Sequence, residues 1–209
     1  MASDPQTYAD LQASLLAWID DTASNIDPTE CIALAERRLN RLLNVPEMES
    51  ITTLSASSSV VSLPSDFWEV RDIYVDASPR VNLEPMSISA ITTAYASNYS
   101  GIPQNYATQG VSLILGPAPD TAYSLVLTYK STIPALSESN TTNWLLTKHP
   151  DLYIAASLAM AEFRGWNDKR LPMLKAWYDE LLQEVNAAGQ RARSGAGPVR
   201  MRPTVRERF

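Results

Sequence analysis

The chain has 209 residues, of which 45% are hydrophobic and 19% are charged, and its net charge is −6. That length supports one full hydrophobic core with room for a smaller subdomain. One cysteine, Cys31, excludes an intrachain disulfide, so nothing indicates secretion. The N-terminus has neither the basic nor the apolar region of a signal peptide, and apolar runs such as residues 111–115 are too short to cross a bilayer. We therefore expect a soluble protein made in a cytoplasm, with no membrane partner.

Residues 7–20 have the helical spacing of apolar residues that predicts an amphipathic helix. Thr7 and Asp10 stand at capping-box spacing at its start. The face expected to pack inward consists of Tyr8, Leu11, Leu15, Trp18 and Ile19.

Residues 27–44 give the clearest helical pattern of the chain. Asp27 is the expected N-cap, Pro28 suits the first helical position, and Glu30 completes a capping box. Pro46 should end the helix. The expected apolar stripe consists of Ile32, Ala35, Leu39, Leu42 and Leu43.

Four further residues of this helix have alternative interpretations. We expect Cys31 to be a small buried residue, as free cysteines usually are. A nucleophilic role would need a histidine close to it, and His149 is the single histidine of the chain. Arg37, Arg38 and Arg41 point away from the stripe. They form either a solvated face or a contact with acidic residues of a neighbouring subunit.

The periodicity changes after residue 49, where β-branched residues and serines replace the helical stripe. Residues 122–130 alternate between apolar and polar side chains, which is typical of a half-buried strand. The segment "GPAPDT" is expected to join this strand to the preceding one as a hairpin. The expected elements are strand regions at 50–63 and 67–76, a short helix within 87–99, and a hairpin of 111–115 with 122–130.

Helical periodicity returns at residue 150, and the pattern is interrupted at Gly165. A last helix is expected to begin near Asp168, because Pro172 is tolerated only in a first turn. The first of these helices should bury Leu152, Ala155, Ala156, Ala159, Met160 and Phe163. The second should bury Leu171, Leu174, Tyr178, Leu181, Leu182 and Val185.

The stretch 140–157, "NTTNWLLTKHPDLYIAAS", is the segment that most resembles a polar site. Pro150 fits the first helical position, so His149 falls at or near a helix N-cap and is interpreted as structural. The residues before it, 144–146, resemble a hydrophobic staple. No second histidine or cysteine cluster suggests a metal site, and no strained nucleophile motif or phosphate-binding loop occurs. The acidic pair Asp20 and Asp21 is interpreted as a solvated helix end.

Charge is distributed unevenly along the chain. Residues 191–209 contain six arginines and one acid, a net charge of +5, whereas the remaining 190 residues carry −11. The Gly, Pro and Arg content beyond residue 189 cannot build a core, which predicts an arm that seeks an acidic surface. The candidate partner-binding residues are Arg191, Arg193, Arg200, Arg202, Arg206, Arg208 and Phe209.

Several segments in this order resemble a family of tailed-phage proteins: "TYADLQASLLAWID", "ECIALAERRLNRLL", "SLPSDFWEVRDIYV", "GIPQNYATQG" and "NTTNWLLTKHPDLY". The chain is similar over roughly residues 7–185 to the head–tail adaptor, or connector, proteins of podovirus-like phages and gene transfer agents. The resemblance implies a ring, usually dodecameric, below the portal. Such a ring continues the DNA channel and joins the capsid vertex to a tail nozzle or tail tube. It also implies that the C-terminal arm docks on the portal.

The expected fold class is α+β, a helical bundle of about four long helices with an inserted small β-rich region and an extended C-terminal arm. The expected boundaries place helices in 1–49 and 136–189, the β-rich insertion in 50–135, and the arm in 190–209.

The leading hypothesis is a structural virion protein at the head–tail junction, without catalysis and without a cofactor or metal. An acidic body around a channel would repel DNA phosphates and let DNA pass. An alternative is a nucleic-acid-binding accessory protein that acts through its arginines, and a third is a virion-associated hydrolase of the cell wall. A solvated arm without a partner also stays open at this point.

Overall fold

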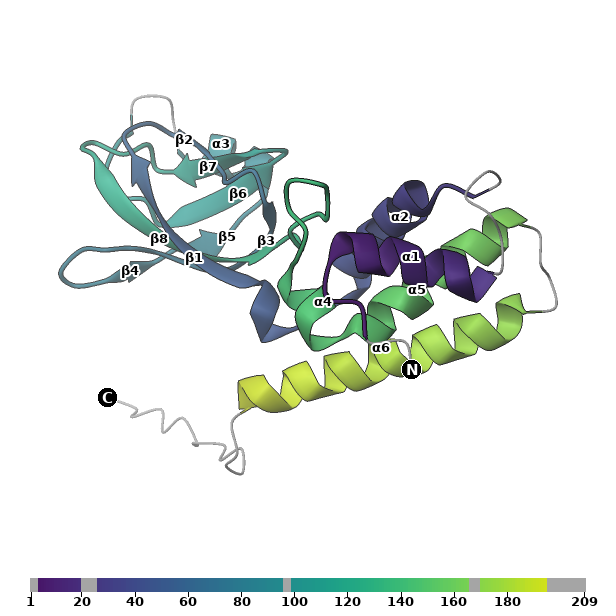
Figure 1. Ribbon diagram of the computed structural model, residues 1–209. Coiled ribbons are helices and arrows are strands. Elements are labelled where there is room, and N and C mark those ends of the chain that lie inside the picture. Colours follow the sequence, from purple (N-terminus) through teal and green to yellow (C-terminus); the bar gives the residue numbers. More distant parts are fainter. Residues whose placement is uncertain (1–3, 20–25, 96–98, 166–169, 195–209) are drawn as a thin grey trace. The chain divides into compact units, whose positions relative to one another are not determined.

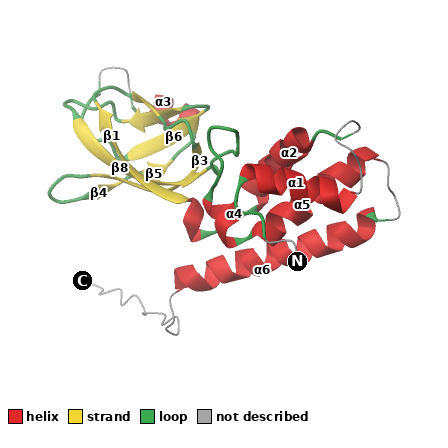
Figure 2. Cartoon of the chain, in the orientation of Figure 1, coloured by secondary structure: helices red, strands yellow, loops and turns green. Residues whose placement is uncertain are grey.

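A computed structural model describes residues 4–19, 26–95, 99–165 and 170–194. The chain divides into two compact units, one formed by residues 1–47 with 133–209 and the other by residues 48–132. Figure 2 shows that the strands fall in the second unit and that nearly all helical residues fall in the first. The sequence places the corresponding boundaries at 50 and 135.

The predicted bundle of about four long helices with a small β-rich insertion is wrong, although the chain is α+β overall. The described residues form six α-helices, two of which have only seven and five residues, and two four-stranded sheets. The sequence pattern missed α4, whose five residues are too few to show helical periodicity, and it missed strands that are too short to show alternation.

The helical unit is built around one central helix, α5, which packs against the other four (Figure 1). Its helices are α1 (Tyr8–Ile19), α2 (Pro28–Leu42), α4 (Trp144–Lys148), α5 (Pro150–Gly165) and α6 (Leu171–Ser194). No helix among the described residues has both the length and the apolar character needed to cross a bilayer.

The starts of the first two helices are as predicted. The Asp10 carboxylate accepts from the Thr7 backbone N–H at 3.0 Å, and the Thr7 hydroxyl accepts from the Asp10 N–H at 3.2 Å, which completes a reciprocal capping box. The Asp27 side chain caps α2 by accepting from the Thr29 N–H at 2.9 Å, and Pro28 occupies the first turn. Pro172 likewise lies in the first turn of α6.

The predicted helix faces are buried or half-buried, with two exceptions among the described side chains, which do not include that of Phe163. Leu42 is 44% exposed and Trp18 is 51% exposed, so neither belongs to the core. In α5 burial goes beyond the predicted stripe, since Tyr153, Leu158 and Ala161 are fully buried as well. A helix enclosed on several sides buries residues outside any single stripe, which explains the weak amphipathic pattern of α5.

The second unit is a sandwich of two four-stranded sheets. A short 3₁₀ turn at Pro46–Met48 comes directly before its first strand. One sheet has the order β1-β8-β3-β4 and the other has the order β2-β7-β6-β5. All strand pairs are antiparallel except β5 with β6. Its elements are β1 (Glu49–Ala56), β2 (Val60–Ser62), β3 (Phe67–Val75), β4 (Val81–Asn82), β5 (Glu84–Pro85), α3 (Ile88–Ala94), β6 (Asn105–Gln109), β7 (Ser112–Gly116) and β8 (Tyr123–Ser131).

The predicted hairpin of 111–115 with 122–130 is wrong, because β7 and β8 belong to different sheets. β7 instead forms a hairpin with β6, a strand that the sequence did not reveal, and the turn uses Gly110 at φ +58°. A positive φ is accessible to glycine at no steric cost, so Gly110 marks the true turn. The segment "GPAPDT" therefore carries the chain from one sheet to the other.

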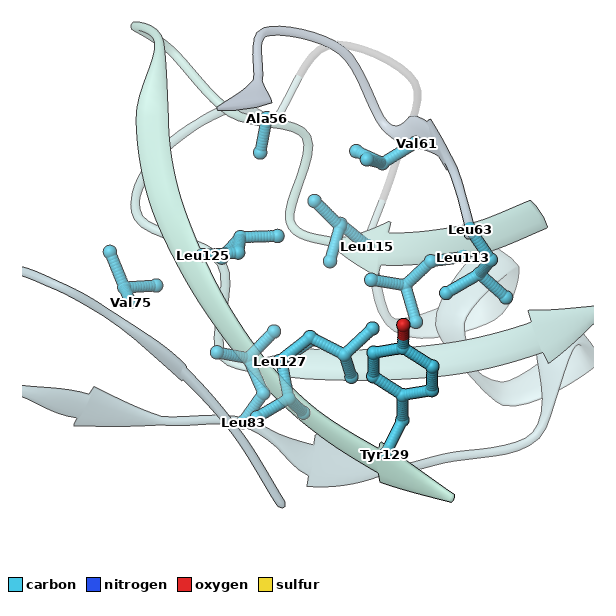
Figure 3. Close-up of a cluster of buried hydrophobic side chains, with 11 residues drawn as sticks. Ala56, Val61, Leu63, Val75, Leu83, Leu113, Leu115, Leu125, Leu127 and Tyr129 are labelled. Carbon is cyan, nitrogen blue, oxygen red and sulfur yellow. The ribbon is translucent and has the colours of Figure 1, made fainter. Parts of the chain in front are cut away.

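The two sheets share one hydrophobic core (Figure 3). Leu125, Leu127 and Tyr129 of β8 are buried between the sheets, as the predicted alternation requires, but the polar residue Lys130 is buried as well. Leu113 and Leu115 of β7 meet them from the opposite sheet.

Candidate partner-binding surfaces

The seven predicted arm residues divide into two groups. Arg191 and Arg193 lie in the last two turns of α6, and both are exposed. The other five, Arg200, Arg202, Arg206, Arg208 and Phe209, lie outside the described residues, as does the acidic pair Asp20 and Asp21.

Arg193 is bound within the helical unit. Its guanidinium donates to the backbone carbonyl of Asn44 at 2.9 Å and to the Asn44 side-chain oxygen at 3.0 Å. The Asn44 N–H donates in turn to the Asn186 side chain at 2.8 Å. One turn earlier, Gly189 packs so closely that an added Cβ would lie 2.8 Å from Cγ1 of Val45. The end of α6, which extends to Ser194, therefore packs against and hydrogen-bonds to the segment that follows α2.

A buried polar cluster that the sequence analysis missed holds the chain where it returns from the β unit. The Glu36 carboxylate of α2 accepts hydrogen bonds from the Leu136 N–H at 2.9 Å and from the Tyr153 hydroxyl of α5. The Asn143 side chain donates to the Pro134 carbonyl and to the Tyr153 oxygen, and it caps α4 by accepting from the Leu146 N–H. These bonds satisfy polar groups that burial would otherwise leave unpaired.

Burial sets the protonation behaviour of this cluster. It raises the pKa of Glu36, while the bonds from Tyr153 and Leu136 oppose that shift by favouring the carboxylate. Burial and the nearby Glu36 also raise the pKa of the Tyr153 phenol. The sequence did contain a signal, because Glu36 lies at helical spacing from Ile32 and Leu39, within the stripe predicted to be buried.

The two residues that could suggest catalysis, His149 and Cys31, occupy positions that the packing of the helices explains. His149 links α4 to α5: its N–H donates to the Leu145 carbonyl, and its own carbonyl accepts from the Tyr153 N–H in the first turn of α5. Cys31 is buried, as predicted, and burial raises the pKa of its thiol, which disfavours the reactive thiolate. The described part of the chain contains no group of three His, Cys, Asp or Glu residues arranged to hold a metal ion.

The helical unit has an apolar hollow bordered by cations. It has a volume of about 440 Å³, and its apolar lining includes Ala159 and Met160 of α5. Arg38 of α2 also lines it, and the carbon of its guanidinium group lies 4.9 Å from the centroid of the Tyr178 ring. Lys175 of α6 contributes a second cation to the lining. We call this hollow the basic groove.

The same unit also has an exposed aromatic patch. Trp18 at the end of α1 stacks on Trp177 of α6, with ring centroids 6.1 Å apart. Met173, one turn before Trp177, is 66% exposed. We call Trp18, Met173 and Trp177 the tryptophan patch. Large exposed apolar side chains that gather in this way are typical of protein–protein contact sites.

The β unit has a hollow of its own, of about 340 Å³, between β3 and the β5–β6 edge of the other sheet. Phe67, Trp68 and Tyr106 contribute aromatic rings to its lining, and Met86 contributes an apolar chain. Trp68 is 43% exposed, so this hollow is a second place where a partner could contact an aromatic residue.

Comparison with known proteins identifies the family. A family model described as SU10 adaptor protein matches residues 6–202. No curated protein matches the chain. The matched range includes every helix and strand of the described residues and part of the basic C-terminal segment. The chain therefore belongs to the SU10 adaptor protein family, a family of phage head–tail adaptors, and it is a structural component of a phage particle.

Proposed function

We propose that this adaptor assembles as a ring, dodecameric in the usual form, below the portal, where it extends the DNA channel and joins the capsid vertex to a tail nozzle or tail tube. The observation that carries the proposal is the family match, which runs from α1 into the basic C-terminal segment. We propose no catalytic step. His149 links α4 to α5 through its backbone, Cys31 is a buried thiol with a raised pKa, and Glu36 is held by a hydrogen bond from Leu136.

We further propose that the C-terminal residues form the portal-docking element. Fifteen residues follow Ser194, and an extended chain of that length spans at most about 50 Å. They carry four arginines and one glutamate and end in Phe209. Arginine–carboxylate pairs and an apolar terminal anchor suit an acidic, partly apolar surface, and repetition around a ring would multiply a modest affinity.

The charge of the rest of the chain supports a channel role. Outside residues 191–209 the chain carries a net charge of −11. Like charge disfavours persistent contact with DNA phosphates, so DNA would pass such a ring without binding tightly.

The test is co-sedimentation with the phage's own portal ring. We would compare the full-length protein, a truncation to residues 1–194, and a full-length variant in which Arg200, Arg202, Arg206 and Arg208 are all glutamine. Truncation after Ser194 is preferable to truncation after residue 190, because it preserves the contacts of Arg193 with Asn44. We expect the full-length protein to sediment with the portal and both variants to lose at least about tenfold in affinity.

Each other outcome has a definite meaning. If the truncated protein binds as well as the full-length protein, the docking element lies elsewhere and the adaptor role stands. If neither binds the portal but the full-length chain binds DNA with an affinity that falls steeply with salt, the nucleic-acid-binding alternative replaces the proposal.

A further inference from the structure

The basic groove and the tryptophan patch lie on two different sides of one helix, α6. At 100° per residue, Leu174 and Tyr178 define the buried face of α6, and both are buried. Met173 and Trp177 lie on one flank of this face, and Trp177 contacts Trp18 of α1. Lys175 lies on the other flank, beside the α2 residue Arg38. Lys175 is two residues away from both Met173 and Trp177, which places it about 160° from each of them around the helix axis.

The charges around the two surfaces are opposite. Glu180 and Glu184 are exposed and fall within the same arc of about 60° as Met173 and Trp177, so the patch side is acidic. Arg170, a cation beside Trp18, is paired with the buried Glu162 at 3.1 Å and donates to the Trp18 carbonyl.

The groove side is basic. Burial raises the pKa of the Tyr178 phenol, and the nearby Arg38 and Arg41 oppose that shift. Lys175 adds a third cation to the groove, against one nearby acid, Asp179. The groove therefore combines an apolar lining with an excess of positive charge, which suits an apolar side chain accompanied by carboxylates.

We propose that the tryptophan patch of one copy docks in the basic groove of the next copy, and that this head-to-tail contact closes the adaptor ring. The inference rests on the ring of the proposed function and assigns its subunit interface. Two different surfaces on one subunit form a heterologous contact, which generates a ring when the rotation closes. Patch-to-patch and groove-to-groove contacts bring like charges together, so both are disfavoured and the direction of assembly is specified.

The first experiment is a cross-link in particles from phage that carry the gene for a Met173→Cys/Lys175→Cys variant. A bismaleimide bridge within one copy leaves the chain a monomer on a denaturing gel, whereas a bridge from position 173 of one copy to position 175 of the next gives multimers. The buried native thiol, Cys31, does not interfere. We expect a ladder of adaptor multimers from the double variant. The single variants M173C and K175C serve as controls and should show no ladder.

The adaptor content of the same particles separates the two proposals. Normal content without a ladder would overturn the interface and leave the ring in place. Absence of the adaptor from wild-type particles would instead overturn the proposed function, and the interface with it.

A charge exchange covers the case in which the cysteine variant does not assemble. Lys175→Glu and Glu180→Lys each place like charges across the contact, and we expect each to reduce the adaptor content of particles by at least about tenfold. The combined variant K175E/E180K restores opposite charges, so its adaptor content should return to within about threefold of wild type. If the combined variant is no better than the single ones, the proposed contact is wrong.

Discussion

Glu36 is a carboxylate that is only 6% exposed, and its protonation is linked to folding. Because burial raises its pKa, the folded protein holds this proton more tightly than the unfolded chain does. The favourable contribution is complete below the unfolded pKa of about 4.3 and is lost as the pH rises through the folded pKa. We expect Glu36→Gln, which keeps an acceptor for Leu136 and Tyr153, to raise the free energy of unfolding at pH 8, with the difference shrinking towards pH 5.

Denaturant unfolding of the wild type and the variant across this pH range measures the effect. Glu36→Ala is the matched control, because it leaves the Leu136 N–H without its acceptor. We expect this change to cost about 2 to 3 kcal/mol near pH 5 and less at pH 8, where the wild type has lost the contribution of the Glu36 proton. A Gln variant less stable than wild type at pH 8 would show that the charged form of Glu36 is favoured by the fold.

At the scale of elements, the position of α6 depends on the close approach of Gly189 to Val45. A Cβ at residue 189 would lie 2.8 Å from Cγ1 and 3.1 Å from Cα of Val45. Gly189→Ala should therefore lower the free energy of unfolding by about 1 to 3 kcal/mol, although alanine is otherwise the better helix former.

The combined variant Gly189→Ala/Val45→Ala tests the cause. Removing the Cγ atoms of Val45 relieves the nearest of these contacts, so the two changes should cost less together than the sum of their separate costs. If the combined cost in thermal or denaturant unfolding equals that sum, the contact between the two side chains does not limit the packing of α6.

The elements also show where sequence patterns succeed and where they fail. The capping residues Asp10 and Asp27 and the start of α5 at Pro150 could be predicted, because a cap is a local interaction between residues close in the sequence. Pairing of β7 with β6 could not, because the pattern of β7 says which face is buried and not which strand lies beside it. Glu36 was missed for a related reason, since its partners Leu136 and Tyr153 are 100 and 117 residues away in the sequence.

At the scale of the whole molecule, the chain consists of two units with separate cores. Leu127 is fully buried between the two sheets, and Leu158 is fully buried in α5. We expect Leu127→Ala to cost about 2 to 5 kcal/mol and to lower hydrogen-exchange protection mainly in the strands. Leu158→Ala should lower protection mainly in α1, α2, α5 and α6. Equal loss throughout the chain from either change would show that the two units unfold as one.

The sequence by itself determined the local patterns of this protein and the distribution of its charge. These are its helix starts, the half-buried alternation of β8, the basic C-terminal segment and the resemblance to head–tail adaptors. The family match confirms that resemblance. Only the tertiary structure decided which distant segments meet, namely the partners of Glu36, the assignment of strands to the two sheets, and the stacking of Trp18 of α1 on Trp177 of α6. The physical reason is that caps and periodicity arise from neighbours in the sequence, whereas sheets, buried carboxylates and docking surfaces arise from contacts that chain folding alone brings together.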